Sequence, residues 1–176
     1  MSEKDNTSKQ QKIFIISLSV FELEDEKGHL NWKVTELVDR SKISRSLIYR
    51  YFGGNKEEIL GEAVRAFVLR FYCLEKSSNN ETFIEKVQRS KKLIEDYPQA
   101  AIFYQRWRNS DSFVSEIFKK TERDYQNLLK KSLPHLNDEE ILALHTCLHG
   151  FVTAPFLDNK ILPEILLRLI KSFKSN

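Results

Sequence analysis

Residues 41–56 read SKISRSLIYRYFGGNK, and the interpretation of the whole chain starts from them. The stretch holds four basic residues, Lys42, Arg45, Arg50 and Lys56, and no acidic residue. The entire chain, in contrast, has a formal net charge of only +3. A positive charge concentrated in one short segment points to an anionic partner more specifically than a mildly basic pI does.

The composition favours an all-α protein. Only five glycines and four prolines occur among 176 residues, too few turn formers for a β-rich fold. No apolar run approaches the roughly 20 residues of a membrane span, so no membrane partner is expected. The polar start, MSEKDNTSKQQK, lacks the apolar core of a signal peptide. We therefore expect a cytoplasmic protein in which Cys73 and Cys147 are reduced.

Apolar residues at helical spacing predict helices along most of the chain. Gly28 suits the position just after the first helix, and Ser44 and Asn55 suit N-caps. The expected helices cover residues 8–26, 32–41, 44–52, 55–76 and 81–97, a stretch that begins at Pro98, and residues 111–133, 138–157 and 161–174.

The second and third expected helices have the form of a helix-turn-helix. They are short, joined by a tight turn and preceded by a longer helix. In that motif the second short helix lies in the major groove, and its early residues meet base edges. Ile48 and Phe52, four positions apart, must face the core, which turns outward Arg45, Ser46, Tyr49 and Arg50. Arginines can pair with guanine edges or phosphates, and hydroxyl groups reach phosphate oxygens.

A plainer interpretation of the same residues stays open. Tyr49 and Tyr51 can be core aromatics, and the charged side chains can form a solvated face without a partner. The order of the residues argues against it. Five features follow one another along the chain: Gly28 at the end of a helix, the apolar-small pair Leu37-Val38, the turn Ile43-Ser44, the spacing Tyr49-x-x-Phe52, and the helix start Lys56-Glu57-Glu58.

This pattern, over residues 27–60, resembles the DNA-binding domain of the tetracycline-repressor (TetR) family. The resemblance implies an all-α fold. It places an N-terminal three-helix helix-turn-helix DNA-binding domain in residues 1–54 and a helical ligand-binding and dimerisation domain in residues 55–176. The helix at 55–76 would connect the two domains.

The chain departs from the family pattern at three places. Lys42 stands where the family usually has Gly, so we expect a left-handed backbone there at a cost near 1 kcal/mol. The spacer before Lys56 is one residue longer than usual. Lys33 replaces a Ser or Thr at the start of the second helix and would supply a charged contact. The expected DNA-contacting residues are therefore Lys33, Thr35, Ser44, Arg45, Ser46, Tyr49, Arg50, Tyr51 and Lys56.

The aromatic residues of the middle helices have two interpretations. The plain one is a helical core. The resemblance implies instead that helices in this region enclose a small apolar effector, in a pocket lined by Phe67, Phe71, Phe103, Tyr104, Trp107 and His145. In the segment HTCLH, His145 and His149 stand four apart and can share a zinc ion. Because Cys147 points off their face and no third acidic ligand lies nearby, packing is favoured, and no metal or cofactor is expected.

The last two expected helices favour dimerisation. In ILPEILLRLIKSF, residues 161–173, apolar residues almost circle the helix, which must then be buried on most sides. A partner subunit supplies that cover, and the resemblance implies a four-helix bundle from two subunits. The predicted interface residues are Ile141, Leu144, Leu148, Phe151, Val152, Ile165 and Leu169. A two-fold dimer would set its recognition helices about 34 Å apart, on a pseudo-palindromic operator.

Residues 81–176 contain no recognisable catalytic constellation, so the expected function is regulation rather than catalysis. We expect a DNA-binding transcriptional regulator that acts as a homodimer, a repressor released by a small apolar ligand. Repression is implied by the resemblance alone. One alternative is a helical protein-interaction adaptor that kept the fold but lost DNA binding. Another is a metal-dependent enzyme or metal sensor built on His145 and His149. The salt dependence of DNA binding distinguishes the regulator from the adaptor, because DNA binding through several cationic side chains weakens steeply as the salt concentration rises.

Overall fold

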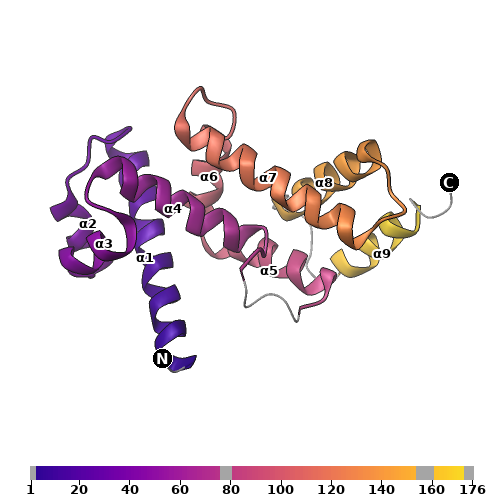
Figure 1. The fold of residues 1–176 in the computed structure, drawn as a ribbon, viewed down its shortest axis with the longest axis horizontal. Coiled ribbons are helices and arrows are strands. Elements are labelled where there is room, and N and C mark those ends of the chain that lie inside the picture. The colour runs from indigo at the N-terminus through magenta and orange to yellow at the C-terminus, as the bar shows by residue number, and fades with distance from the viewer. Residues whose placement is uncertain (1–2, 76–80, 154–160, 173–176) are drawn as a thin grey trace. The chain divides into compact units, whose positions relative to one another are not determined.

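The computed structural model describes residues 3–75, 81–153 and 161–172, with the side chains of residues 3–8, 162 and 170 left out. Over these residues the chain forms nine α-helices and no strand (Figure 1), which confirms the expected all-α class. The helices are α1 (Glu3–Lys27), α2 (Val34–Ser41), α3 (Arg45–Phe52), α4 (Lys56–Phe71), α5 (Phe83–Asp96), α6 (Pro98–Trp107), α7 (Phe113–Ser132), α8 (Asp138–Thr153) and α9 (Leu162–Ser172).

Several helix ends differ from the expectation, among them the start of α1, the start of α2 and the end of α4. α1 begins at Glu3 rather than at residue 8, because a helix can continue past its apolar stripe into polar residues. α2 begins at Val34 rather than at residue 32, because the preceding segment is held in a loop by a buried tryptophan. α4 ends at Phe71 rather than at residue 76, where Cys73 adopts a positive φ of 53°. The expected helix ends at residues 157 and 174 lie outside the described residues.

The chain forms two compact units. The first contains residues 1–69 and 99–119, and the second contains residues 70–98 and 120–176. The first unit is therefore larger than the DNA-binding domain expected at residues 1–54, because it also includes most of α4, α6 from Gln99 onward and the start of α7. The functional boundary at residues 54 and 55 stays a prediction.

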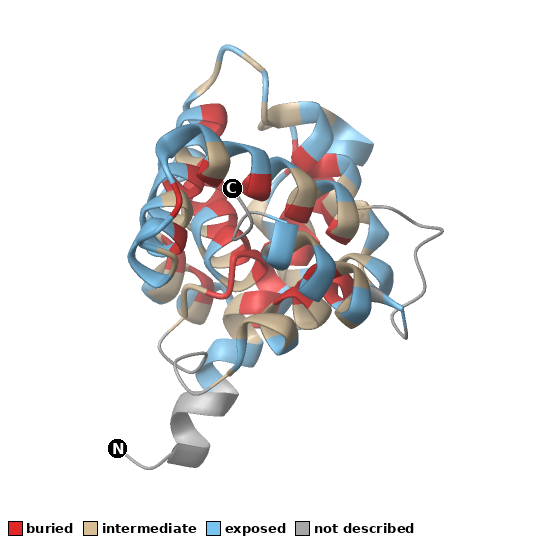
Figure 2. Cartoon of the chain, turned by 90° about the vertical axis from the view of Figure 1, so that its right-hand side faces the viewer, coloured by how far each residue is buried: buried red, intermediate tan, exposed pale blue. Residues whose placement is uncertain are grey.

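In the first unit, α6 packs along the last turns of α1. The ring of Phe21 stacks on that of Phe103, with centroids 4.2 Å apart, and meets the edge of Phe67 at 5.4 Å. Beside this aromatic core, Arg106 pairs with Asp25 at 2.6 Å. Buried positions lie on the inward sides of the helices, as Figure 2 shows. The long first helix is thus held on one side by the residues that follow α5.

In the second unit, α5 packs against both α8 and α9. The inward side of α8 is buried, and it carries four of the residues predicted for a dimer interface: Ile141, Leu144, Leu148 and Val152, all between 0% and 6% exposed. These four side chains are covered by the chain's own unit. The apolar face that the sequence pattern assigned to a partner subunit is, at these positions, the core of the second unit. No helix among residues 3–75, 81–153 and 161–172 has both the length and the hydropathy needed to cross a membrane.

Candidate nucleic-acid interface

The turn between α2 and α3 has a left-handed residue at its centre. Lys42 adopts φ 57° and ψ 25°, and its backbone N–H donates to Val38 O at 2.9 Å. This confirms the expected left-handed backbone at Lys42, a position that the family usually fills with glycine. Ser41 completes the turn, since its hydroxyl donates to Leu37 O at 2.7 Å and accepts from the N–H of the buried Ile43. The relative orientation of α2 and α3 is fixed by these contacts.

Replacing Lys42 with glycine is expected to stabilise the fold by about 0.5–1 kcal/mol. The left-handed region costs a side-chain-bearing residue roughly 1–2 kcal/mol, and the extra flexibility of glycine in the unfolded chain cancels part of that gain. Urea unfolding of both proteins measures the difference. The control is Asp39→Gly in the interior of α2, where the same residue should destabilise by about 1 kcal/mol. Equal effects at the two positions would contradict the strain argument.

The start of α2 presents two polar side chains to solvent. The Lys33 N–H donates to the Glu36 carboxylate at 2.7 Å, and this backbone hydrogen bond holds the pKa of Glu36 below its usual value. The carboxylate therefore satisfies a backbone donor that has no partner within the helix. The side chains of Lys33 and Thr35 are exposed, as a phosphate contact requires.

A buried carboxylate anchors the loop that leads into α2. Glu24 is only 1% exposed. It accepts hydrogen bonds from Trp32 Nε1 at 2.6 Å and from the Leu30 N–H at 2.9 Å, and it meets His29 Nδ1 at 3.0 Å. The Lys56 ammonium donates a hydrogen bond to Leu30 O in the same loop. The ammonium of Lys56, predicted to contact a phosphate, is therefore turned toward the chain's own backbone.

The third helix has one buried side and one exposed side. Ile48 and Phe52 are 0% and 2% exposed, as the i, i+4 spacing predicts. Ser44 is the N-cap of α3, and its hydroxyl lies 3.2 Å from that of Ser46 rather than on a backbone N–H. Exposed side chains are those of Ser44, Arg45, Ser46 and Arg50, whereas Tyr49 and Tyr51 are half-buried. The plain alternative, in which both tyrosines are core aromatics, is not what the structure shows.

Arg45 and Tyr49 form a pair on the exposed side of α3. The guanidinium donates from Nε and Nη2 to the Tyr49 hydroxyl at 2.9 and 2.8 Å, and its central carbon lies 5.2 Å from the ring centroid. The pair spans one helical turn, so the ring supports an arginine that would otherwise sample many rotamers. An arginine held in this way loses less entropy when it binds a base or a phosphate.

The end of α3 requires glycine. Gly53 adopts φ 109°, and a Cβ placed there would lie 2.6 Å from the Glu58 Cβ. The next helix is capped by Asn55, whose side-chain oxygen accepts from the Glu58 N–H at 2.9 Å, as expected. The Glu58 carboxylate accepts from the Gly54 N–H at 2.7 Å.

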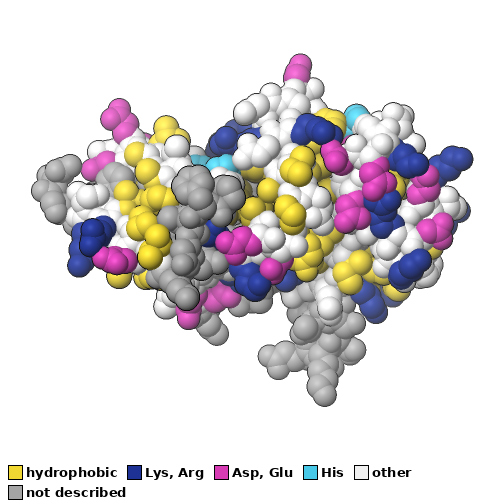
Figure 3. Space-filling view, turned by 180° about the vertical axis from the view of Figure 1, so that it is seen from behind, with side chains coloured by type: hydrophobic (Ala, Val, Ile, Leu, Met, Phe, Trp, Pro, Cys, Tyr) yellow, Lys and Arg dark blue, Asp and Glu magenta, His cyan; other side chains and the backbone are white. Residues whose placement is uncertain are grey.

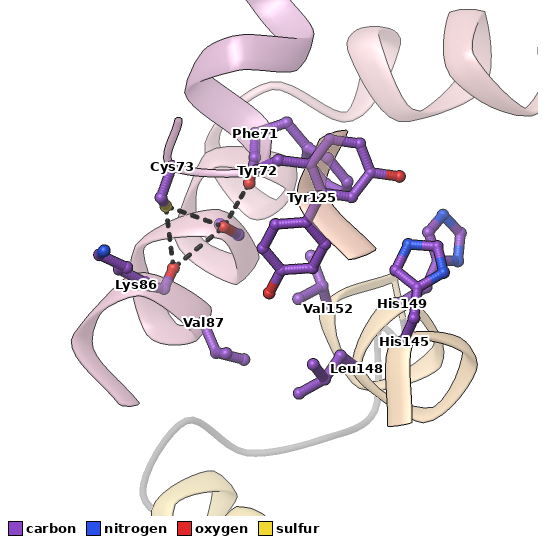
Figure 4. A pocket seen from close by; sticks show the side chains of 11 residues that line it. Phe71, Tyr72, Cys73, Lys86, Val87, Tyr125, His145, Leu148, His149 and Val152 are labelled. Carbon is purple, nitrogen blue, oxygen red and sulfur yellow. Dashed lines mark hydrogen bonds between the residues drawn. The ribbon is translucent and has the colours of Figure 1, made fainter. Parts of the chain in front are cut away.

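The six residues predicted to line one effector pocket lie in both units. Phe67, Phe103, Tyr104 and Trp107 belong to the first unit, and the first three of them are buried in its core. Phe71 and His145 belong to the second unit and line a cavity there, together with the side chains of Val87, Tyr125, Leu148 and Val152 (Figure 4). The prediction of a single pocket lined by all six stays a prediction.

The cavity of the second unit is small and apolar. Its volume is about 20 Å³, room for roughly one water molecule. Burial raises the pKa of the Tyr125 hydroxyl above its usual range, and burial likewise raises the pKa of the Cys73 thiol. That thiol donates to Lys86 O at 3.3 Å, so Cys73 closes the corner after α4 (Figure 4).

The two histidines of α8 contact aromatic rings. Nδ1 of His145 lies 3.2 Å from Gln126 Nε2, and its ring centroid lies 5.8 Å from that of Tyr125. The ring of His149 meets the edge of Phe71 at 6.2 Å. Within residues 3–75, 81–153 and 161–172, no group of three or more His, Cys, Asp or Glu side chains is placed to hold a metal ion.

Two residues that make contacts near the helix-turn-helix are not identified by the sequence pattern. Glu24 has no role in the sequence pattern described above, although its place beside the apolar positions of α1 is a signal of burial. Lys9 belongs to the polar start MSEKDNTSKQQK, in which the sequence pattern gives no residue a role. In the structure its ammonium nitrogen lies 5.5 Å from the ring centroid of Tyr51 on α3.

Comparison with known proteins agrees with this geometry. Residues 21–63, about a quarter of the chain, match the family model described as bacterial regulatory proteins, tetR family. The match covers the end of α1, all of α2 and α3, and the first half of α4. No curated protein and no solved structure was found to match the chain. The helix-turn-helix, with its exposed arginines, thus matches the DNA-binding domain of the tetR family over residues 21–63, and this match supports a DNA-binding transcriptional regulator.

Proposed function

We propose that this regulator is a repressor that binds a pseudo-palindromic operator as a homodimer and leaves it when a small apolar ligand binds. The observation that carries the proposal is the exposed side of α3, where Arg45, Ser46 and Arg50 face solvent. Lys33 and Thr35, at the start of α2, are exposed as well. A helix of this kind reads about half of a site, and a two-fold dimer brings a second copy to the next major groove. Of the predicted contacts, Lys56 is the weakest candidate, because its ammonium binds Leu30 O.

The dimer would form through the exposed side of α8 and α9. Leu142, Ile161 and Leu167 are 55%, 48% and 47% exposed, unusually high for large apolar side chains. Hydrophobic side chains gather on the face of the second unit seen in Figure 3. Three residues of the predicted interface are half-buried and so retain surface for a partner: Phe151, Ile165 and Leu169. We propose that these six side chains, rather than the buried side of α8, contact the second subunit.

Replacing Leu167 with glutamate is expected to weaken the dimer at least tenfold. A carboxylate at the centre of the proposed interface would have to be buried without a partner, and this opposes association by more than about 1.4 kcal/mol. Analytical ultracentrifugation measures the dimer dissociation constant. The control is Leu128→Glu on α7, because Leu128 is also an exposed leucine of the second unit, at 37%. An unchanged dissociation constant for the Leu167 variant would contradict the proposed interface.

Ligand release requires the second unit to change. A cavity of about 20 Å³ is far below the roughly 300–1,000 Å³ of small-molecule pockets. An apolar ligand would therefore enter only by moving aromatic side chains such as Phe71 and Tyr125. Binding would then favour a minor conformation in which the space is open, and the operator would favour the closed one.

Selection of genomic DNA fragments by the purified protein tests the proposal. The control is a double variant, Arg45→Ala with Tyr49→Ala, which removes the supported arginine and leaves the buried side of α3 intact. A pseudo-palindrome recovered by the wild type alone would support an operator-binding dimer. Equal recovery by both proteins at low salt would overturn the proposed α3 contacts. It would also favour the adaptor function, in which the fold is kept without sequence-specific DNA binding.

A further inference from the structure

The charges of α1 are divided along its length. Between Asn6 and Phe21 the helix contains no acidic residue, and its only charges there are those of Lys9 and Lys12. Its last turns carry four acidic residues, Glu22, Glu24, Asp25 and Glu26. The N-terminal turns of α1 extend past the helix-turn-helix, as Figure 1 shows. Glu3 and Asp5 precede this stretch, so the part of α1 suited to an anionic partner is the segment from Asn6 to Phe21, and the last turns are not suited to one.

The basic segment of α1 lies beside α3, the second short helix of the helix-turn-helix. The Lys9 ammonium nitrogen is 5.5 Å from the ring centroid of Tyr51, within the range of a cation–π contact. Tyr51 belongs to the last turn of α3 and is half-buried, so its ring forms the side of the helix that faces α1. Lys9 is exposed and Lys12, one turn further on, is half-buried. The lysine is thus held against α3 while its charge stays accessible.

The dimensions of DNA place such a charge next to phosphates. A helix with its side chains is about 10–12 Å across, and the major groove is about 12 Å wide. A group on the flank of a helix that fills the groove therefore meets the wall of the groove, which consists of the phosphate backbone. If α3 fills the groove, a cation 5.5 Å from a ring on that flank would lie nearer to phosphate oxygens than to base edges.

We propose that Lys9, supported by Lys12, forms a phosphate-contact site on α1, outside residues 21–63 that match the family model. The site extends the DNA footprint beyond the helix-turn-helix. Tyr51 acts in it as a positioning residue, because its ring holds Lys9 against α3 in the absence of DNA. The contact carries no sequence information, since a phosphate is the same at every base pair.

The test is the salt dependence of DNA binding, measured by fluorescence anisotropy between 50 and 200 mM salt on a selected fragment and on a random fragment. Each phosphate contact contributes about −0.9 to the slope of log K against log salt. Lys9→Gln should make the slope shallower by about one, so that the wild type loses about threefold more affinity than the variant over this range. The loss at low salt should be equal on both fragments.

Three further variants make the result specific. Lys9→Arg should keep the wild-type slope, because the charge remains. Lys120→Gln, an exposed lysine of α7 in the second unit, should leave the slope unchanged and shows the effect of removing a distant charge. Tyr51→Leu should lower affinity on both fragments, because it removes the ring that holds the lysine.

An unchanged slope for Lys9→Gln would overturn the proposal. A loss confined to the selected fragment would also overturn it, because a base contact and not a phosphate contact would then be lost. Far-UV circular dichroism and the thermal midpoint of each variant accompany the measurement. Should Lys9→Gln fail to fold, Lys12→Gln tests the same site, and its expected change in slope has the same sign.

Discussion

Replacing Glu24 with alanine is expected to destabilise the fold by about 2–4 kcal/mol, because the hydrogen bonds of a buried carboxylate are lost. The indole N–H of Trp32 and the backbone N–H of Leu30 would each lose their acceptor. An unsatisfied buried donor costs roughly 1–3 kcal/mol. Because the same loop leads into α2, specific DNA binding should fall together with stability.

Urea unfolding followed by tryptophan fluorescence measures this effect, since Trp32 lies at the site. Glu24→Gln is the matched variant. Its amide oxygen can still accept from Trp32 and Leu30, so we expect it to retain more than half of the lost stability. Glu57→Ala, an exposed glutamate of α4 in the same unit, should change stability by less than about 0.5 kcal/mol. A Glu24→Ala protein as stable as the wild type would show that water replaces the carboxylate.

The Arg45→Ala variant is expected to lose about 1–3 kcal/mol of specific DNA binding, up to roughly two-hundredfold in affinity. The arginine is the exposed residue of α3 with the most defined position, because two hydrogen bonds and a ring contact hold it on Tyr49. A base contact made by this side chain would be lost only on the selected site. Anisotropy on selected and random fragments at one salt concentration separates the two kinds of loss.

Tyr49→Phe is the matched variant for that experiment. It keeps the ring under the guanidinium and removes the hydroxyl group that accepts both hydrogen bonds. We expect a loss smaller than that of Arg45→Ala, because the arginine remains but is less restricted. Equal losses of Arg45→Ala on the two fragments would assign Arg45 to a phosphate and leave Ser46 and Arg50 as the candidates for base recognition.

Local features of the helix-turn-helix could be predicted from the sequence, because they depend on residues that are neighbours in the chain. The burial of Ile48 and Phe52 follows from their spacing on one helical turn. The left-handed Lys42 follows from the turn that two short helices require. A cap such as Asn55 acts within three residues of itself. Each of these properties is decided over a few bonds, so the linear pattern contains it.

Contacts between distant segments could not be predicted in the same way. An apolar stripe states that one side of a helix is covered, but not by what. The interface predicted on Ile141, Leu144, Leu148 and Val152 shows this limit, because these side chains are buried within the second unit, where α5 of the same chain packs against α8. A partner subunit and a neighbouring helix leave the same periodicity in the sequence.

The sequence by itself determined the helices, the tight turn and the positive charge of the recognition helix, because these properties come from short-range sterics and composition. Only the tertiary structure decided the roles of Glu24, Lys56 and Lys9. Glu24 and Lys56 hold the loop before α2, and Lys9 lies against Tyr51 at the edge of α3. A charged side chain has the same propensities whether it is buried, bound to a backbone carbonyl or exposed beside an aromatic ring. Its role depends on which atoms the fold brings within a few ångströms of it.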